Sequence, residues 1–113
     1  MIEIYHNPRC RKSREALQLL ESRNLAHNVV LYLENIPSKI ELAKIIEKLG
    51  VKPIELVRTQ EAIWKTEYKG KTLSDNDILL AMMKHPKLIE RPIIIKGEKA
   101  IVGRPAEKIL TLF

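Results

Sequence analysis

Cysteine, aromatic residues and long apolar segments are all scarce in this sequence of 113 residues. Its single cysteine, Cys10, cannot form an internal disulfide, whereas a secreted domain of this size usually contains several cysteines. No segment approaches the roughly 20 consecutive apolar residues that span a membrane, and the N-terminus has no apolar signal-peptide core. The sequence therefore predicts a cytoplasmic protein, independent of membranes, whose one thiol stays reduced.

The low aromatic content also argues against nucleic-acid binding, although the net charge is +6 and the pI is about 9.6. With aromatic residues at 4 %, the chain has little material for stacking bases. Lysine and glutamate alternate through KIELAKIIEK, as on a solvated helix face. The positive charge is concentrated elsewhere, because Arg9, Arg11, Lys12 and Arg14 surround Cys10. Such a cluster suits a small anion, and we expect no nucleic-acid partner.

What the sequence does contain is an alternation of strand and helix patterns. The expected strands are 2–5, 27–33, 93–95 and 100–102, and the expected helices are 11–23, 38–49, 74–85 and 105–113, with two short helices between 53 and 73. A β-α-β unit makes its two strands parallel, and KGEK between the last two strands predicts an antiparallel hairpin. The predicted fold class is α/β, thioredoxin-like: one domain over 1–113, a four-stranded mixed sheet and a helical insertion at about 38–86.

Cys10 is predicted to lie where the first strand ends and the first helix begins. Free backbone N–H groups and the helix dipole would then favour the thiolate and lower the pKa from ~8.5 into roughly the 3.5–7.5 range. The same N–H groups would also bind an oxyanion. His6 is positioned to bias the ionisation, and the Ser13 hydroxyl to donate to the sulfur. A buried structural cysteine is the alternative. No Cys/His/carboxylate cluster indicates a metal site.

Two arginines each precede a proline at the ends of the predicted hairpin. Arg91 precedes Pro92 where the third strand starts, and Arg104 precedes Pro105 where the fourth ends. These two points lie at the same end of the sheet, and the register of the first strand decides whether that end faces Cys10. Solvated arginines are the alternative. An X-Pro bond entering a strand is also a common place for a cis peptide, which we expect at Pro92.

Several motifs together resemble one known family. They are IYHNPRCRKSR, VVLYLENIPS, ELVRTQE, HPKLIERPI and GRP, in this order along essentially the whole chain. With them the sequence resembles the glutaredoxin-coupled arsenate reductases (ArsC-like proteins), a family related to the Spx-type regulators. The family fold, thioredoxin-like with a helical insertion, agrees with the pattern above. The plasmid-borne members carry small residues where this sequence has Arg11 and Lys12, and they have a longer C-terminal tail than a chain that stops at Phe113. Both differences indicate the short chromosomal branch.

The resemblance implies a nucleophile, a histidine that modulates its pKa, three arginines that hold the oxyanion, and a cis-proline. In this order, these residues are Cys10, His6, Arg58, Arg91, Arg104 and Pro92. Nothing local distinguishes Arg58. Arginine suits the task because its planar, permanently charged fork matches a tetrahedral oxyanion.

The implied reaction is reduction of arsenate to arsenite. The Cys10 thiolate attacks arsenic, glutathione attacks next, and glutaredoxin takes the glutathione as a mixed disulfide. The resemblance implies no bound cofactor, glutathione as co-substrate, glutaredoxin as partner and a monomer. Two alternatives stay open. One is a glutathione-dependent thiol oxidoreductase with another substrate. The other is a Spx-like, RNA polymerase-binding regulator that lacks the Cys-x-x-Cys switch, because Ser13 occupies the second position.

Overall fold

The computed structural model describes all 113 residues, which form two compact units. We call residues 1–35 together with 91–113 the sheet unit, and residues 36–90 the helical unit. The insertion expected at about 38–86 falls within the helical unit. Each unit is described by itself below.

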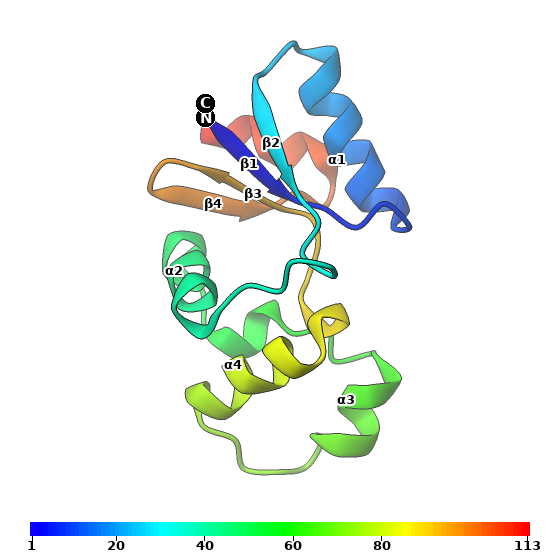
Figure 1. The fold of residues 1–113 in the computed structure, drawn as a ribbon, viewed down its shortest axis with the longest axis vertical. Coiled ribbons are helices and arrows are strands. Elements are labelled where there is room, and N and C mark those ends of the chain that lie inside the picture. Colours follow the sequence, from blue (N-terminus) through cyan, green and yellow to red (C-terminus); the bar gives the residue numbers. More distant parts are fainter. The chain divides into compact units, whose positions relative to one another are not determined.

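The sheet unit contains a mixed sheet of four strands, as predicted (Figure 1). The strands are β1 (Ile2–Tyr5), β2 (His27–Val30), β3 (Ile93–Lys96) and β4 (Lys99–Val102). Their order in the sheet is β2-β1-β3-β4, so the first strand occupies an inner position. The β1–β2 pair is parallel, and the β1–β3 and β3–β4 pairs are antiparallel. This arrangement confirms the α/β, thioredoxin-like fold class.

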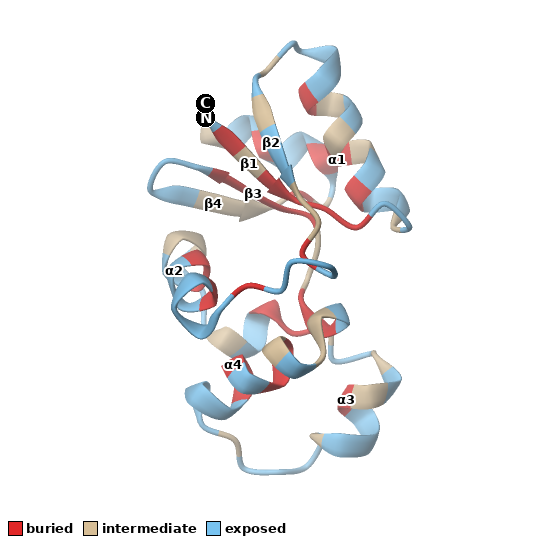
Figure 2. Cartoon of the chain, viewed as in Figure 1, coloured by how far each residue is buried: buried red, intermediate tan, exposed pale blue.

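One face of this sheet is covered by two helices, α1 (Arg11–Ser22) and the 3₁₀ helix η3 (Ala106–Leu112). Buried side chains of both helices meet those of β1 and β3, as the red segments of Figure 2 indicate. This core comprises Ile2, Ile4, Ala16, Leu20, Ile94, Ala106 and Ile109. Burying this apolar surface fixes α1 on the sheet, and with it the loop that joins β1 to α1.

The helical unit is built from short helices with strong start signals. They are α2 (Lys39–Leu49), η1 (Pro53–Leu56), α3 (Ala62–Glu67), α4 (Asp75–Lys84) and η2 (Pro86–Leu88). Capping boxes start α2 at Ser38 and α4 at Ser74, and Gly50 ends α2 in the left-handed conformation. A single bridge pairs Val57 with Ile89.

Two predicted elements differ from the structure. The second strand, expected over 27–33, ends at Val30, because the Leu31 carbonyl accepts hydrogen bonds from the N–H groups of Glu34 and Asn35 and so starts a turn. The last helix is 3₁₀ instead of α-helical over its length. None of the helices is long and apolar enough to cross a membrane.

Candidate active site

Cys10 lies at the N-cap of α1, at the end of the loop that follows β1. Its backbone is extended, and its N–H donates to the Asn7 carbonyl at 3.0 Å, which closes a tight turn. The backbone N–H groups of Ser13 and Lys12, in the first turn of the helix, lower the pKa of its thiol. Helix α1 has no side-chain cap and no acidic residue in its first turn. Cys10 therefore occupies the N-cap position, close to the free N–H groups of the first turn, without the side-chain hydrogen bond of a regular cap.

The Arg91 side chain acts on the same thiol. Burial raises the pKa of the Cys10 thiol, but the opposing effects are larger in sum: the Ser13 N–H, the hydrogen bond and charge of Arg91, and the Lys12 N–H. The result is a pKa below the ordinary value for cysteine. Cys10 is half-buried and free of disulfide bonding. It is thus both accessible and disposed to be a thiolate.

His6, Ser13 and Asn7 form a buried hydrogen-bond network behind this turn. Nδ1 of His6 and Oγ of Ser13 are 2.6 Å apart, and the Asn7 N–H donates to the same oxygen at 3.0 Å. The Ser13 hydroxyl is therefore engaged here and not on the sulfur, so Ser13 acts on Cys10 through its backbone N–H. Burial, followed by the charge of Arg14, lowers the pKa of His6; Glu21 and a backbone hydrogen bond with Ser13 oppose them.

The basic residues beside Cys10 have different partners. Arg14 donates from Nη1 to the Pro8 carbonyl at 2.9 Å and so holds the loop against the start of the helix. Arg11 and Lys12 both pair with Glu15, at 3.1 and 3.8 Å. These exposed pairs belong to the helix surface. The sequence predicted the cluster of positive charge, but not that Arg14 holds the loop while Arg11 and Lys12 pair on the helix surface.

The register of the sheet brings Arg91 and Arg104 to the end where the Cys10 loop starts. Tyr5, the last residue of β1, pairs with Ile93, and Ile93 pairs with Val102. The residues just before Ile93 and just after Val102 therefore lie beside the segment that follows Tyr5. Arg104 donates from Nη1 to the Arg91 carbonyl at 3.3 Å, so it contacts the backbone of the residue whose side chain lowers the pKa of Cys10.

Both X-Pro bonds at this end of the sheet are cis. The Arg91–Pro92 bond is cis, and the Arg104–Pro105 bond, for which the sequence suggested no such geometry, is cis as well. The Pro92 carbonyl accepts the Gly103 N–H at 2.9 Å, which ties the two segments together.

Arg58 belongs to the helical unit. Its N–H donates to the Leu88 carbonyl at 2.7 Å, next to the Val57–Ile89 bridge. Its guanidinium lies 3.5 Å from a Glu61 carboxylate oxygen and 3.9 Å from one of Glu90. Its role in binding an oxyanion stays a prediction from the resemblance. Pairing between distant segments fixes its position, which is why no local pattern marks it.

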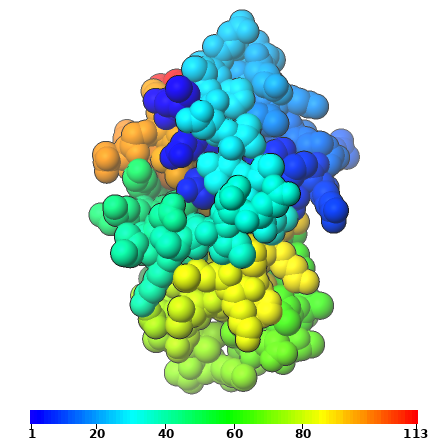
Figure 3. Space-filling model, in the orientation of Figure 1, coloured from blue at the N-terminus to red at the C-terminus, as the bar shows by residue number.

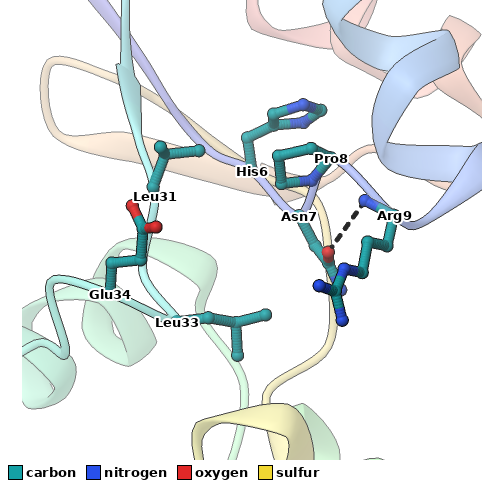
Figure 4. Close-up of a pocket in the computed structure, with 7 residues that line it drawn as sticks. All are labelled: His6, Asn7, Pro8, Arg9, Leu31, Leu33 and Glu34. Atoms are coloured by element: carbon teal, nitrogen blue, oxygen red, sulfur yellow. Dashed lines mark hydrogen bonds between the residues drawn. The ribbon is translucent and has the colours of Figure 1, made fainter.

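A pocket of about 330 Å³ opens between the Cys10 loop and the turn after β2 (Figure 4). His6, Asn7, Pro8 and Arg9 line one side, and Leu31, Leu33 and Glu34 line the other. Sequence reasoning missed this pocket because it assigned residues 31–33 to a strand. No group of three or more His, Cys, Asp or Glu side chains is placed to hold a metal ion.

Comparisons with known proteins point to one family. The model of the ArsC family matches residues 5–112. A protein named arsenate reductase from Neisseria meningitidis is 46 % identical over 110 residues, covering 96 % of this chain and 94 % of the relative. A similarly named protein from Haemophilus influenzae is 41 % identical over 111 residues, covering 96 % of each. The solved structure of an arsenate reductase from Vibrio cholerae is 43 % identical, with a TM-score of 0.95, covering 99 % of this chain and 97 % of the other.

Proposed function

Because this chain belongs to the ArsC family, we propose that it is an arsenate reductase whose nucleophile is Cys10. One observation carries the proposal: Cys10 lies at the N-cap of α1, where two backbone N–H groups and the Arg91 side chain lower the pKa of its thiol. This environment supports a thiolate and offers positive charge and N–H donors to an arriving oxyanion. The names of relatives at 41–46 % identity support the choice of arsenate.

The first step is attack of the Cys10 thiolate on arsenic(V). A sulfur–arsenic bond forms, an arsenic–oxygen bond breaks, and the oxygen leaves as water after taking up protons. Arg91 offsets the negative charge of both reactants, because its guanidinium is permanently positive. Its five N–H donors, held in a fixed fork, can also bind the oxygens of the oxyanion. Donors that are already in place stabilise charge on the oxyanion without reorganisation.

The electrons must come from outside the chain, because Cys10 is its only cysteine. In our proposal glutathione attacks the arsenic adduct, and a glutaredoxin thiolate then attacks the glutathione sulfur. Attack of glutathione releases a second oxygen as water, and attack of glutaredoxin breaks the bond between arsenic and the glutathione sulfur. The two thiols thereby form a mixed disulfide and lose two electrons, which reduce arsenic(V) to arsenic(III). Water then replaces the Cys10 sulfur on arsenic, so that arsenite leaves and the Cys10 thiolate is regenerated. The protein needs no bound cofactor for this reaction and acts as a monomer in a reducing compartment such as the cytoplasm.

Two further arginines complete the proposal. Arg104 contacts the Arg91 backbone and contributes its own positive charge at this end of the sheet. Arg58 is assigned from the resemblance. Replacing either with lysine keeps the charge and removes the planar fork, so we expect the KM for arsenate to rise more than kcat falls.

The decisive experiment is arsenate-dependent oxidation of NADPH, coupled through glutathione, glutaredoxin and glutathione reductase. Wild type should turn over, and Cys10→Ser should not. Wild type without turnover would reject arsenate as the substrate. Undiminished turnover by Cys10→Ser would reject the nucleophile.

A glutathione-dependent thiol oxidoreductase with another substrate is the second candidate. One observation favours it: the Lys12 and Ser13 N–H groups act on the sulfur itself, so they stabilise a thiolate whatever electrophile it attacks. Turnover of a glutathione mixed disulfide, without turnover of arsenate, would select this candidate.

A further inference from the structure

The pocket beside the Cys10 loop is not used by any step proposed above. We propose that it binds the backbone of the reducing thiol, a zwitterionic peptide thiol of the glutathione class. Arg9 binds a carboxylate of this ligand, and Glu34 binds its α-ammonium group. The proposal rests on the proposed function, because it names the subsite for the second reactant at Cys10.

The shape of the pocket fits a ligand of this size. Its volume of about 330 Å³ is at the lower end of the range for small-molecule sites, which suits a short peptide. Leu31 and Leu33 provide an apolar wall, and the buried His6 lines the pocket next to the end of β1 (Figure 4). Methylene groups of a γ-glutamyl chain can lie against such a wall. In the space-filling view the dark blue N-terminal segment and the cyan segment around residue 31 lie next to each other at the surface (Figure 3).

Two opposite charges line the pocket from opposite sides. Arg9 projects from the Cys10 loop, and Glu34 from the turn after β2 (Figure 4). Neither side chain forms an ion pair within the chain, whereas the neighbouring Arg11 and Lys12 both pair with Glu15. An inorganic oxyanion would be attracted by Arg9 but repelled by Glu34. A zwitterion satisfies both, so charge complementarity selects it.

The pocket is also close to the nucleophile, because two of its lining residues are directly connected to Cys10. Arg9 is the residue before Cys10, and the Cys10 N–H bonds to the carbonyl of Asn7, another lining residue. A peptide bound in this pocket lies beside the turn that carries the sulfur. Holding two reactants together raises their effective concentration for the attack.

Binding is tested without turnover by titrating Cys10→Ser with S-methylglutathione, which cannot react, and following NMR chemical shifts. We expect saturable shifts at Leu31, Leu33 and the Arg9–Cys10 segment. Adding Glu34→Gln or Arg9→Gln should raise Kd by roughly fivefold. Arg11→Gln is the matched control, since it removes an exposed arginine of the same segment that pairs with Glu15, and it should leave Kd unchanged. Shifts that map elsewhere, or a Kd insensitive to both pocket charges, would overturn the proposal.

Kinetics supply the second test. In the coupled assay, Glu34→Gln should raise the KM for glutathione about fivefold and leave the KM for arsenate unchanged. N-acetylglutathione, which lacks the ammonium, should give wild type and Glu34→Gln the same KM. If wild type does not turn over arsenate, the proposed function fails, but saturable S-methylglutathione binding still supports the pocket. Turnover with an unchanged glutathione KM in both pocket variants would overturn the pocket alone.

Discussion

At Cys10, burial and hydrogen bonding act in opposite directions on one proton. Burial raises the pKa of the thiol, while the N–H groups of Ser13 and Lys12 and the side chain of Arg91 lower it by more. The backbone donors belong to the helix and are retained in every substitution except proline, so Arg91 is the contribution that a side-chain substitution can isolate.

We expect Arg91→Gln to raise the pKa of Cys10, because the variant loses both the charge and the charged hydrogen bond on the sulfur. Arg91→Lys should raise it less, since the charge is retained. The rate of alkylation by iodoacetamide as a function of pH measures the midpoint. Arg11→Gln is the control, because the Arg11 side chain is exposed and pairs with Glu15. Superimposable profiles for wild type and Arg91→Gln would contradict the assigned contact.

His6 should make the protein less stable in acid. Its folded pKa lies below the ordinary 6.5, chiefly because it is buried, so the unfolded chain binds the proton more readily. Stability is therefore lost as the pH falls from about 6.5 towards the folded pKa. We expect urea unfolding of wild type between pH 7 and 5 to lose more stability than unfolding of His6→Asn. Parallel curves would show that His6 titrates alike in both states.

At the scale of elements, the sequence predicted best what is encoded locally. The capping boxes at Ser38 and Ser74 and the hairpin of β3 and β4 are short-range signals, and the structure contains all of them. The end of β2 was missed, because the turn at Leu31 is closed by backbone hydrogen bonds within an apolar stretch that resembles a strand. The pocket was missed with it.

Gly103 joins β4 to the segment that carries Arg104, and it has no room for a side chain. A Cβ there would lie 2.8 Å from Cδ1 of Ile94, which is fully buried, and 3.3 Å from Cγ of Pro92. We expect Gly103→Ala to lower the free energy of unfolding by about 1–3 kcal/mol, as overpacking of a core usually does. Urea denaturation measures the loss, with the exposed Lys99→Ala on β4 as control. An unchanged midpoint would mean that the side chains of Ile94 and Pro92 make room for the methyl group without loss of stability.

At the scale of the whole molecule, the candidate site depends on pairing between distant parts of the chain. The sequence placed Arg91 and Arg104 at one end of a hairpin, but only the pairing of Tyr5 with Ile93 sets that end beside the Cys10 loop. Register is a property of two segments together, so a pattern read along one segment cannot supply it. Arg58 is the extreme case, since its local sequence has no distinguishing feature.

The two units allow a test of whether 1–113 behaves as a single domain, as the sequence predicts. Each unit holds about half of the chain, a size at which independent folding is marginal. Met82 is fully buried in the helical unit, and we expect Met82→Ala to lower the free energy of unfolding by about 2–5 kcal/mol.

If the chain unfolds as one domain, the Met82→Ala variant should lose the same free energy of unfolding by two measurements. One is the fluorescence of Trp64, the only tryptophan, and the other is hydrogen exchange at the Ile94 amide in the sheet unit. Leu80→Ala truncates an exposed leucine of the same helix and is the control. A loss of stability reported by Trp64 fluorescence but not by exchange at Ile94 would show two domains that unfold independently.

The sulfur at the start of α1 ties the reaction to the state of the helix. Whatever free energy the first-turn N–H groups contribute to the thiolate, the thiolate contributes equally to the first turn. In the proposed reaction, conversion of Cys10 into the arsenic adduct removes the anion, so we expect the first turn to loosen for as long as the adduct lasts. We therefore expect the stability of the start of α1 to differ between the free thiolate and the adduct, and a protein that binds there could detect this difference.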